Sequence, residues 1–243
     1  MKTYKEAVKF QLKMYLISNK VFVPFVVLFL CLYVVYYNGK LEELVASYNI
    51  TSVICFYLMF IVGLNYNETI DLTTEQLLVL RLKSERKYYL CNEAVLFLVS
   101  CMFAFTAVGY SLLANFLKMF TKVDGRYMIF DLVIGLFLHI IISFAGAMIG
   151  SIFHDRIFRD RYTLLCVAFV TAVISIAKEL ILKVFAGFRY IMWVFPPVSE
   201  YISRFKGKHI YYLKDVGIVV IGLIIYTFVI GAIKEKILIR KKF

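Results

Sequence analysis

Residues 131–153 form a continuous apolar run, DLVIGLFLHIIISFAGAMIGSIF, in which Asp131 is the only side chain with a formal charge. A helix needs about 20 predominantly apolar residues to cross the hydrocarbon core of a bilayer, which is about 30 Å thick. The run meets that length. It therefore predicts a transmembrane helix.

Five further apolar runs extend this prediction to the whole chain. Hydrophobic residues make up 62% of the 243 positions, whereas soluble domains contain roughly 45–50%. Charged residues make up only 18%, which excludes a disordered chain. We predict an all-α polytopic membrane protein, a single transmembrane domain over residues 1–243 with six transmembrane helices at about 21–37, 46–64, 91–115, 131–153, 163–185 and 213–233.

The distribution of Lys and Arg predicts the orientation of the chain. The formal net charge is +12, but the cations lie in short segments between the apolar runs rather than on one basic face. We therefore expect no nucleic acid as a partner. Seventeen cations lie in the amino-terminal segment, the loops after the second and fourth spans, and the tail, whereas eight lie in the other loops. This asymmetry predicts that both termini are cytoplasmic.

Residues 3–20 predict a helix on the membrane surface. Lys5, Lys9 and Lys13 recur every fourth residue, and apolar side chains occupy many of the positions between them. This pattern is typical of an interfacial amphipathic helix that directs Lys at anionic lipid headgroups. The alternative is that these cations only set the orientation of the first span.

The cytoplasmic loop 65–89 predicts a short docking helix. Thr73 followed by Gln76 suits a capping box, and acidic residues before basic ones agree with the helix dipole, so we expect a helix from Thr73 to Arg86. Such a short helix cannot bury its leucines alone in water, and they must meet the membrane surface or a partner protein. We favour a partner, with Leu77 and Leu78 as anchors. The predicted contact residues are Thr73, Glu75, Leu77, Leu78, Arg81, Lys83 and Arg86.

The segment 186–212 before the last span should face outside, yet it is too apolar for an ordinary loop. One interpretation is a re-entrant segment that dips into the outer leaflet and turns at the prolines, because irregular backbone at that depth needs cover from protein or a water-filled cavity. The other interpretation is an aromatic belt at the interface. The residues concerned are Trp193, Phe195, Pro196 and Pro197.

Four polar residues within the predicted spans are candidate functional sites, because ionisable groups are costly inside a bilayer. They are His139, Lys178, Glu179 and Lys183. Glu179 and Lys183 are four residues apart and can pair on a helix, so local pairing and snorkelling are favoured over a functional role. For His139 a buried, hydrogen-bonded structural role is favoured over a proton relay.

Motifs for catalysis are missing from the sequence. It contains no GxxxxGK[ST], HExxH or GxSxG, which are the patterns of a P-loop, a zinc protease and a serine hydrolase. The five cysteines have no CxxC spacing, so neither a zinc site nor a redox pair is indicated. We predict no catalytic, cofactor-binding or metal-binding residues, and we expect that the chain is not itself an enzyme.

Four features together carry a family resemblance. They are the interfacial segment Tyr4–Lys20, six spans with both termini inside, the loop TTEQLLVLRLKSERKYY at 73–89, and the Pro-containing apolar segment before the last span. In this arrangement the chain resembles the membrane subunits of type-2 ABC exporters over nearly its whole length. The resemblance implies a permease whose first cytoplasmic loop carries a coupling helix, and whose segment before the last span forms short re-entrant helices.

The resemblance also implies partners and cargo. A separate ABC ATP-binding subunit would bind ATP and Mg, and a second copy of the chain or a sister permease would complete a pathway surrounded by membrane lipid. Related small exporters in Gram-positive bacteria move antimicrobial or cytolytic peptides, so we expect an amphipathic or hydrophobic peptide or a lipophilic compound as cargo, and a bacterial plasma membrane as location. The alternatives are a substrate-capturing membrane subunit of an importer and a membrane-embedded enzyme.

Overall fold

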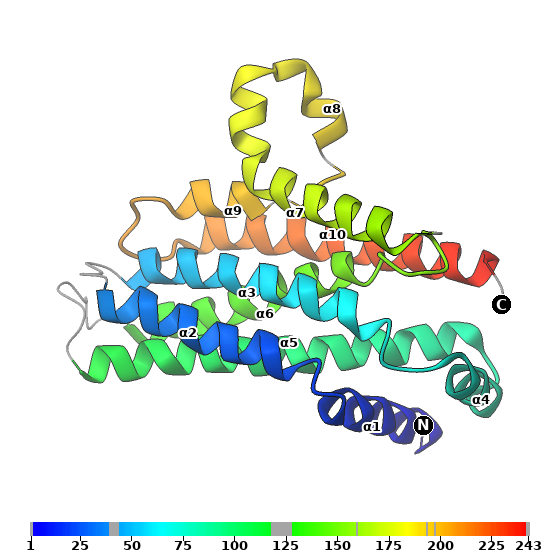
Figure 1. Ribbon diagram of the computed structural model, residues 1–243. Coiled ribbons are helices and arrows are strands. Elements are labelled where there is room, and N and C mark those ends of the chain that lie inside the picture. The colour runs from blue at the N-terminus through cyan, green and yellow to red at the C-terminus, as the bar shows by residue number, and fades with distance from the viewer. Residues whose placement is uncertain are drawn as a thin grey trace.

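The computed structural model describes residues 2–38, 44–117, 128–158, 160–192, 194–196 and 198–241. These residues form helices joined by short non-helical segments, and none of them forms a β-strand, which confirms the predicted all-α class. The helices, shown in Figure 1, are α1 (Lys2–Ile17), α2 (Phe22–Asn38), α3 (Leu44–Tyr66), α4 (Leu72–Leu82), α5 (Glu85–Phe116), α6 (Met128–Gly150), α7 (Arg161–Val184), η1 (Ala186–Phe188), α8 (Arg189–Met192), α9 (Val198–Phe205) and α10 (Leu213–Arg240).

Four helices, α3, α5, α6 and α10, are long and apolar enough to cross a membrane, which indicates a membrane protein. The helices α1 and α2 pass the same test only as a pair, and they are bent by 69° at the break between them. The apolar stretch Arg161–Ser175 of α7 is shorter than these four. By length and composition the described chain therefore supports four of the six predicted spans, and α2 and α7 occupy the positions of the other two.

The centre of the bundle is the contact between α3 and α6. Three glycines allow the two backbones to touch: a methyl group added at Gly63, Gly146 or Gly150 would overlap a backbone carbonyl of the opposite helix. Gly146 and Gly150 are four residues apart on one face of α6, a spacing that lets membrane helices approach closely. The pair is further fixed by the end of α3, where the Asn67 amide donates hydrogen bonds to the carbonyls of Ser151 and Phe153 at 3.0 Å.

The helix α1 is amphipathic, as its sequence predicts. Ala7, Gln11 and Tyr15 are buried on one face, and Gln11 donates a hydrogen bond of 2.8 Å to Asn92 of α5. Lys5, Lys9 and Lys13 are exposed on the other side. Contact with lipid headgroups stays a prediction.

Both ends of the described chain lie at the same end of the bundle, where α4 also lies (Figure 1). The end of α2, the start of α3 and the end of α5 lie at the opposite end (Figure 1). The end of α7, η1 and α8 project from the side of the bundle (Figure 1). The end that carries α4 therefore also carries the first helix and the end of the last helix of the described chain.

The glycine contact predicts that Gly150→Ala destabilises the protein by about 1–3 kcal/mol, because the backbones of α3 and α6 must move apart to admit the methyl group. The measurement is thermal unfolding of purified protein in detergent. Gly109→Ala on α5 is a matched control, since its added methyl group would meet no atom within 4 Å. That variant should be neutral or stabilised by up to about 1 kcal/mol. Equal loss of stability in both variants would contradict the close contact.

Candidate functional site

The helix α4 begins and ends at signals that differ from the predicted ones. Asp71, not Thr73, is the residue that caps its start, and the Asp71 carboxylate accepts a hydrogen bond of 3.3 Å from the Thr74 amide. Hydrogen bonds from Thr74 lower the pKa of Asp71. The helix ends at Leu82, because Lys83 adopts a left-handed conformation at φ 53° and Ser84 caps the next helix. The prediction that this helix continues to Arg86 is therefore wrong, because Arg86 belongs to α5.

The two faces of α4 have different surroundings. Leu78 and Leu82 are buried in an apolar cluster with Ala7, Tyr88 and Leu238. Leu77 and Leu80 are 62% and 72% exposed. The interpretation of Leu78 as a partner anchor is therefore wrong, because the chain's own α1, α5 and α10 already cover it. The exposed leucines available to a partner are Leu77 and Leu80.

The charged residues around α4 follow the same division. Glu75 is buried and forms an ion pair with Arg156, which lies in the turn between α6 and α7. Burial raises the pKa of Glu75, and the positive charge of Arg156 opposes that shift. On the exposed side Arg81 pairs with Glu6 of α1 at 3.0 Å, and Arg86 pairs with Glu235 of α10 at 3.1 Å. Thr73 and Lys83 are exposed as well.

A second set of polar side chains lies directly behind Glu75. Lys234 of α10 is almost fully buried and donates a hydrogen bond of 2.8 Å to the Ser151 hydroxyl, just after the end of α6. Burial, reinforced by the positive charges of Arg156 and Lys234, lowers the pKa of His154 to about 4. We call Glu75, Ser151, His154, Arg156 and Lys234 the junction cluster, because it joins α4, α10 and the chain between α6 and α7.

Three members of the junction cluster, Glu75, His154 and Lys234, line a small internal space. This cavity has a volume of about 20 Å³ and is lined by groups that include Glu75, Asn92, His154 and Lys234. That is room for about one water molecule, and a water there could bond to several of these polar atoms. The cluster is thus a packed polar connection rather than a substrate cavity.

The predicted external site is described only in part. Trp193 and Pro197 lie outside the described residues. Pro196 is buried, Phe195 is half-buried, and Met192 is buried. Tyr190 and Val194 are exposed, so the chain itself does not cover the whole apolar segment. A re-entrant position in the membrane stays a prediction.

The predicted intramembrane polar residues have local partners where they are described. His139 is fully buried between the Thr51 hydroxyl, 2.9 Å from its Nε2, and the Gly135 carbonyl, 2.7 Å from its Nδ1. A neutral ring with its proton on Nδ1 donates to the Gly135 carbonyl. The Thr51 hydroxyl has one proton, which is shared between His139 Nε2 and the Ser47 carbonyl at 3.0 Å. These local partners agree with a structural role. Lys178 is buried and pairs with Glu200 of α9 at 3.1 Å. Lys183 is exposed at the end of α7, and the side chain of Glu179 lies outside the description.

The described residues contain no group of three or more His, Cys, Asp or Glu side chains that could hold a metal ion. Neither a scan against protein-family models nor searches of curated proteins and of solved structures found a match. The candidate functional site is therefore defined by geometry alone: the exposed face of α4, backed by the junction cluster.

The buried ion pair predicts an asymmetric effect on stability. Arg156→Met leaves Glu75 buried without its counter-charge and should cost about 3–5 kcal/mol of unfolding free energy. The double variant Glu75→Leu with Arg156→Met removes both charges and should recover most of that loss. Denaturant unfolding in detergent measures both. A double variant no more stable than Arg156→Met alone would contradict a pair held by mutual neutralisation.

The low pKa of His154 predicts a pH dependence of stability. The unfolded chain binds the imidazole proton below about pH 6.5, whereas the folded chain binds it only near pH 4. Stability is therefore full above about 6.5 and falls as the pH drops towards 4, by up to about 3 kcal/mol. His154→Gln should flatten this part of the curve, measured as melting temperature against pH. Curves of identical shape for the two proteins would show that His154 does not contribute.

Proposed function

We propose that this chain is the transmembrane permease subunit of an ATP-driven ABC exporter, and that α4 is the helix through which a separate ATP-binding subunit moves it. The observation that carries the proposal is the division of α4 into two faces. Leu78, Leu82 and Glu75 attach one face to the bundle, whereas Leu77 and Leu80 are exposed on the other. A short helix with exposed leucines on a fixed base suits the transmission of force from a partner.

The surface beside α4 has room for a partner side chain. An open cleft of about 600 Å³ lies next to Leu80 and includes Lys83, Ser84 and Ile239. Apolar anchors at the centre with charges around them are typical of protein interfaces. Arg81 and Lys83 would steer an acidic partner surface, which affects the rate of association more than its strength.

In this proposal the junction cluster transmits a displacement of α4 to the long apolar helices. Displacement of α4 would act through Glu75 on Arg156 and so on the chain between α6 and α7, and through its packed leucines on α5 and α10. ATP and Mg would be bound by the partner, which favours one arrangement of the bundle by binding it more tightly. The chain itself performs no chemistry in this proposal.

The proposed topology has six spans, with α2 and α7 as the two beyond the four that are long and apolar enough. The termini and α4 share one end of the bundle (Figure 1), and the excess of cations in the corresponding segments favours the cytoplasm for that end. The pathway would form between two copies of the chain, or between this chain and a sister permease. An amphipathic or hydrophobic peptide, or a lipophilic compound, is the cargo that apolar spans with few charges suit best.

The proposal predicts that Leu77→Asp with Leu80→Asp uncouples export. Both side chains are exposed and away from the bundle core, so the variant should insert and fold normally. Binding of the ATP-binding subunit should weaken at least tenfold, which corresponds to about 1.4 kcal/mol, because a single anchor at the centre of an interface can contribute about 2 kcal/mol or more. The measurements are affinity of the detergent-purified complex and ATP-dependent export in vesicles.

The matched control replaces the same residues with Met, which keeps the apolar contact and should leave coupling near the wild-type level. Arg81→Ala should weaken binding much less than the double aspartate variant, since its pair with Glu6 is exposed. Normal export by the double aspartate variant would contradict the assignment of α4 as the coupling helix.

A further inference from the structure

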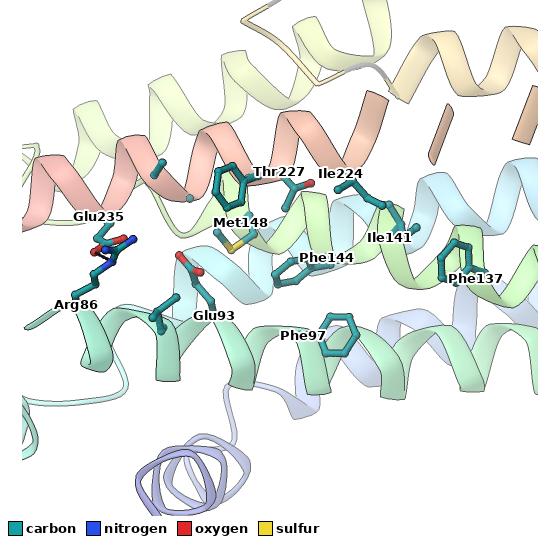
Figure 2. Close-up of a pocket in the computed structure, with 14 residues that line it drawn as sticks. Arg86, Glu93, Phe97, Phe137, Ile141, Phe144, Met148, Ile224, Thr227 and Glu235 are labelled. Atoms are coloured by element: carbon teal, nitrogen blue, oxygen red, sulfur yellow. Dashed lines mark ion pairs between the residues drawn. The ribbon is translucent and has the colours of Figure 1, made fainter. Parts of the chain in front are cut away.

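A large cavity lies between α5, α6 and α10, and no residue of α4 lines it (Figure 2). Its volume is about 430 Å³, which is within the range of roughly 300–1,000 Å³ found for small-molecule sites. Each of the three helices contributes residues spaced three or four apart, so one stripe of each helix lines the cavity. The cavity is therefore built from continuous helix faces and is complete within a single chain.

The lining changes from charged to aromatic along the length of the cavity (Figure 2). Arg86 and Glu235 form their ion pair at one end. Glu93 lies two turns further along α5, about 10 Å from Arg86 in the axial direction. Beyond it the lining is apolar except for Thr227, whose hydroxyl donates a hydrogen bond to the Leu223 carbonyl, and Phe144 and Phe137 lie towards the far end (Figure 2). A molecule with a polar head and an apolar body matches this gradient.

Glu93 is the group in the lining that lacks a direct partner. Within the described part of the chain it forms no hydrogen bond or ion pair, whereas Glu235 is paired with Arg86. Lys234 attracts Glu93 electrostatically, but its ammonium is hydrogen-bonded to Ser151 and it does not line the cavity. The charges that line the cavity are two carboxylates and one guanidinium, and the guanidinium is paired with Glu235, so the negative charge of Glu93 favours a cationic ligand beside it.

The mouth of the cavity is surrounded by exposed apolar side chains. Phe228 is 78% exposed, and Phe97, Phe137 and Ile224 are also exposed. These residues belong to α5, α6 and α10, all long and apolar enough to cross a membrane, so the mouth would face hydrocarbon rather than water. A ligand that enters this way must already be dissolved in the bilayer.

The absence of a side chain at Gly231 leaves space next to the Glu93 carboxylate. A methyl group added at Gly231 would lie 3.3 Å from the Glu93 Oε1 atom and 3.0 Å from the Met148 Cε atom. A larger side chain at this position would therefore fill the cavity beside the carboxylate. This contact supplies a variant that blocks the cavity without changing its charge.

We propose that this cavity binds a single-chain amphiphile with a cationic amine head, the ammonium at the Glu93 carboxylate and the chain along Phe97 and Phe144. A charge pair shielded from water by aromatic side chains attracts more strongly than one at a protein surface. The apolar chain contributes about 0.8 kcal/mol for each methylene group removed from water. The inference goes beyond the exporter function, because the site needs neither an ATPase nor a second copy of the chain.

The test uses the full chain in phosphatidylcholine nanodiscs with a photoreactive dodecylamine, and a photoreactive dodecanol of the same length as comparison. Mass spectrometry locates the labelled residues. At equal membrane concentration the amine should label the cavity stripes of α5, α6 and α10 at least fivefold more than the alcohol. Glu93→Gln should reduce amine labelling to the level of the alcohol, and Glu93→Asp, which keeps the charge, should retain the preference for the amine.

Two further variants separate blockage of the cavity from loss of charge. Gly231→Val should reduce labelling by both probes, and Gly231→Ala should do so to a smaller degree if the valine variant fails to fold. Glu6→Gln removes a carboxylate on α1 that pairs with Arg81 and does not line the cavity; it is the matched control and should change nothing. Unchanged amine labelling in Glu93→Gln would overturn the proposal. So would cross-linking of two chains through a cysteine at Phe228 with no amine labelling, because a second copy would then cover the cavity.

Discussion

The close backbone contact between α3 and α6 is the constraint on which the rest of the structure depends. In a bilayer, apolar side chains gain little by leaving lipid for protein, so helices associate through tight packing and interhelical hydrogen bonds. Gly63, Gly146 and Gly150 supply the tight packing. Thr51 on α3 and His139 on α6 supply a buried hydrogen bond within the same pair. The other long helices pack around this pair.

The same contact fixes the position of the junction cluster. Because Gly150 holds the end of α6 against α3, the following Ser151 is within reach of Lys234 on α10 and its carbonyl accepts from Asn67. A buried charge such as Lys234 adds little net stability, since desolvation offsets its interactions. Its effect is positional: it joins α10 to the chain that carries Arg156, and through Glu75 to α4. The candidate site is therefore connected to the apolar core through these contacts.

The sequence patterns identified the positions of the helices well, but they did not show which side chains of α4 pack against the rest of the chain. Each predicted span corresponds to one helix, because about 20 apolar residues between charged segments leave few other structures. The short helix in the loop 65–89 was also predicted, but not its cap at Asp71 or its end before Ser84. Both Asp and Ser are good capping residues, so these signals were available. Periodicity alone did not show that Leu78 is buried and Leu77 exposed. Which face of α4 is buried depends on contacts with α1 and α10, which are distant in the sequence.

The buried interior held the features that sequence alone could not supply. Lys234 directly follows the last predicted span and is one of the seventeen cations expected on the cytoplasmic side, yet it is almost fully buried. Only the fold brings Ser151 and Glu93 near it. Gly146 and Gly150 were a signal that could have predicted the α3–α6 contact from their spacing. The cavity beside Glu93 combines residues from three helices, and no single stretch of sequence contains enough of them to indicate a site.

The most direct test of the coupling role is site-specific photo-cross-linking from α4 in native membranes. A photoreactive amino acid at Leu80 should cross-link to a protein that contains a P-loop, and the yield should change when ATP is added. The same amino acid at Phe116, an exposed residue at the opposite end of α5, should give no such product. Cross-links from Leu80 to lipid alone, or equal cross-linking from both positions, would contradict the account of α4 as the helix that receives the work of an ATPase.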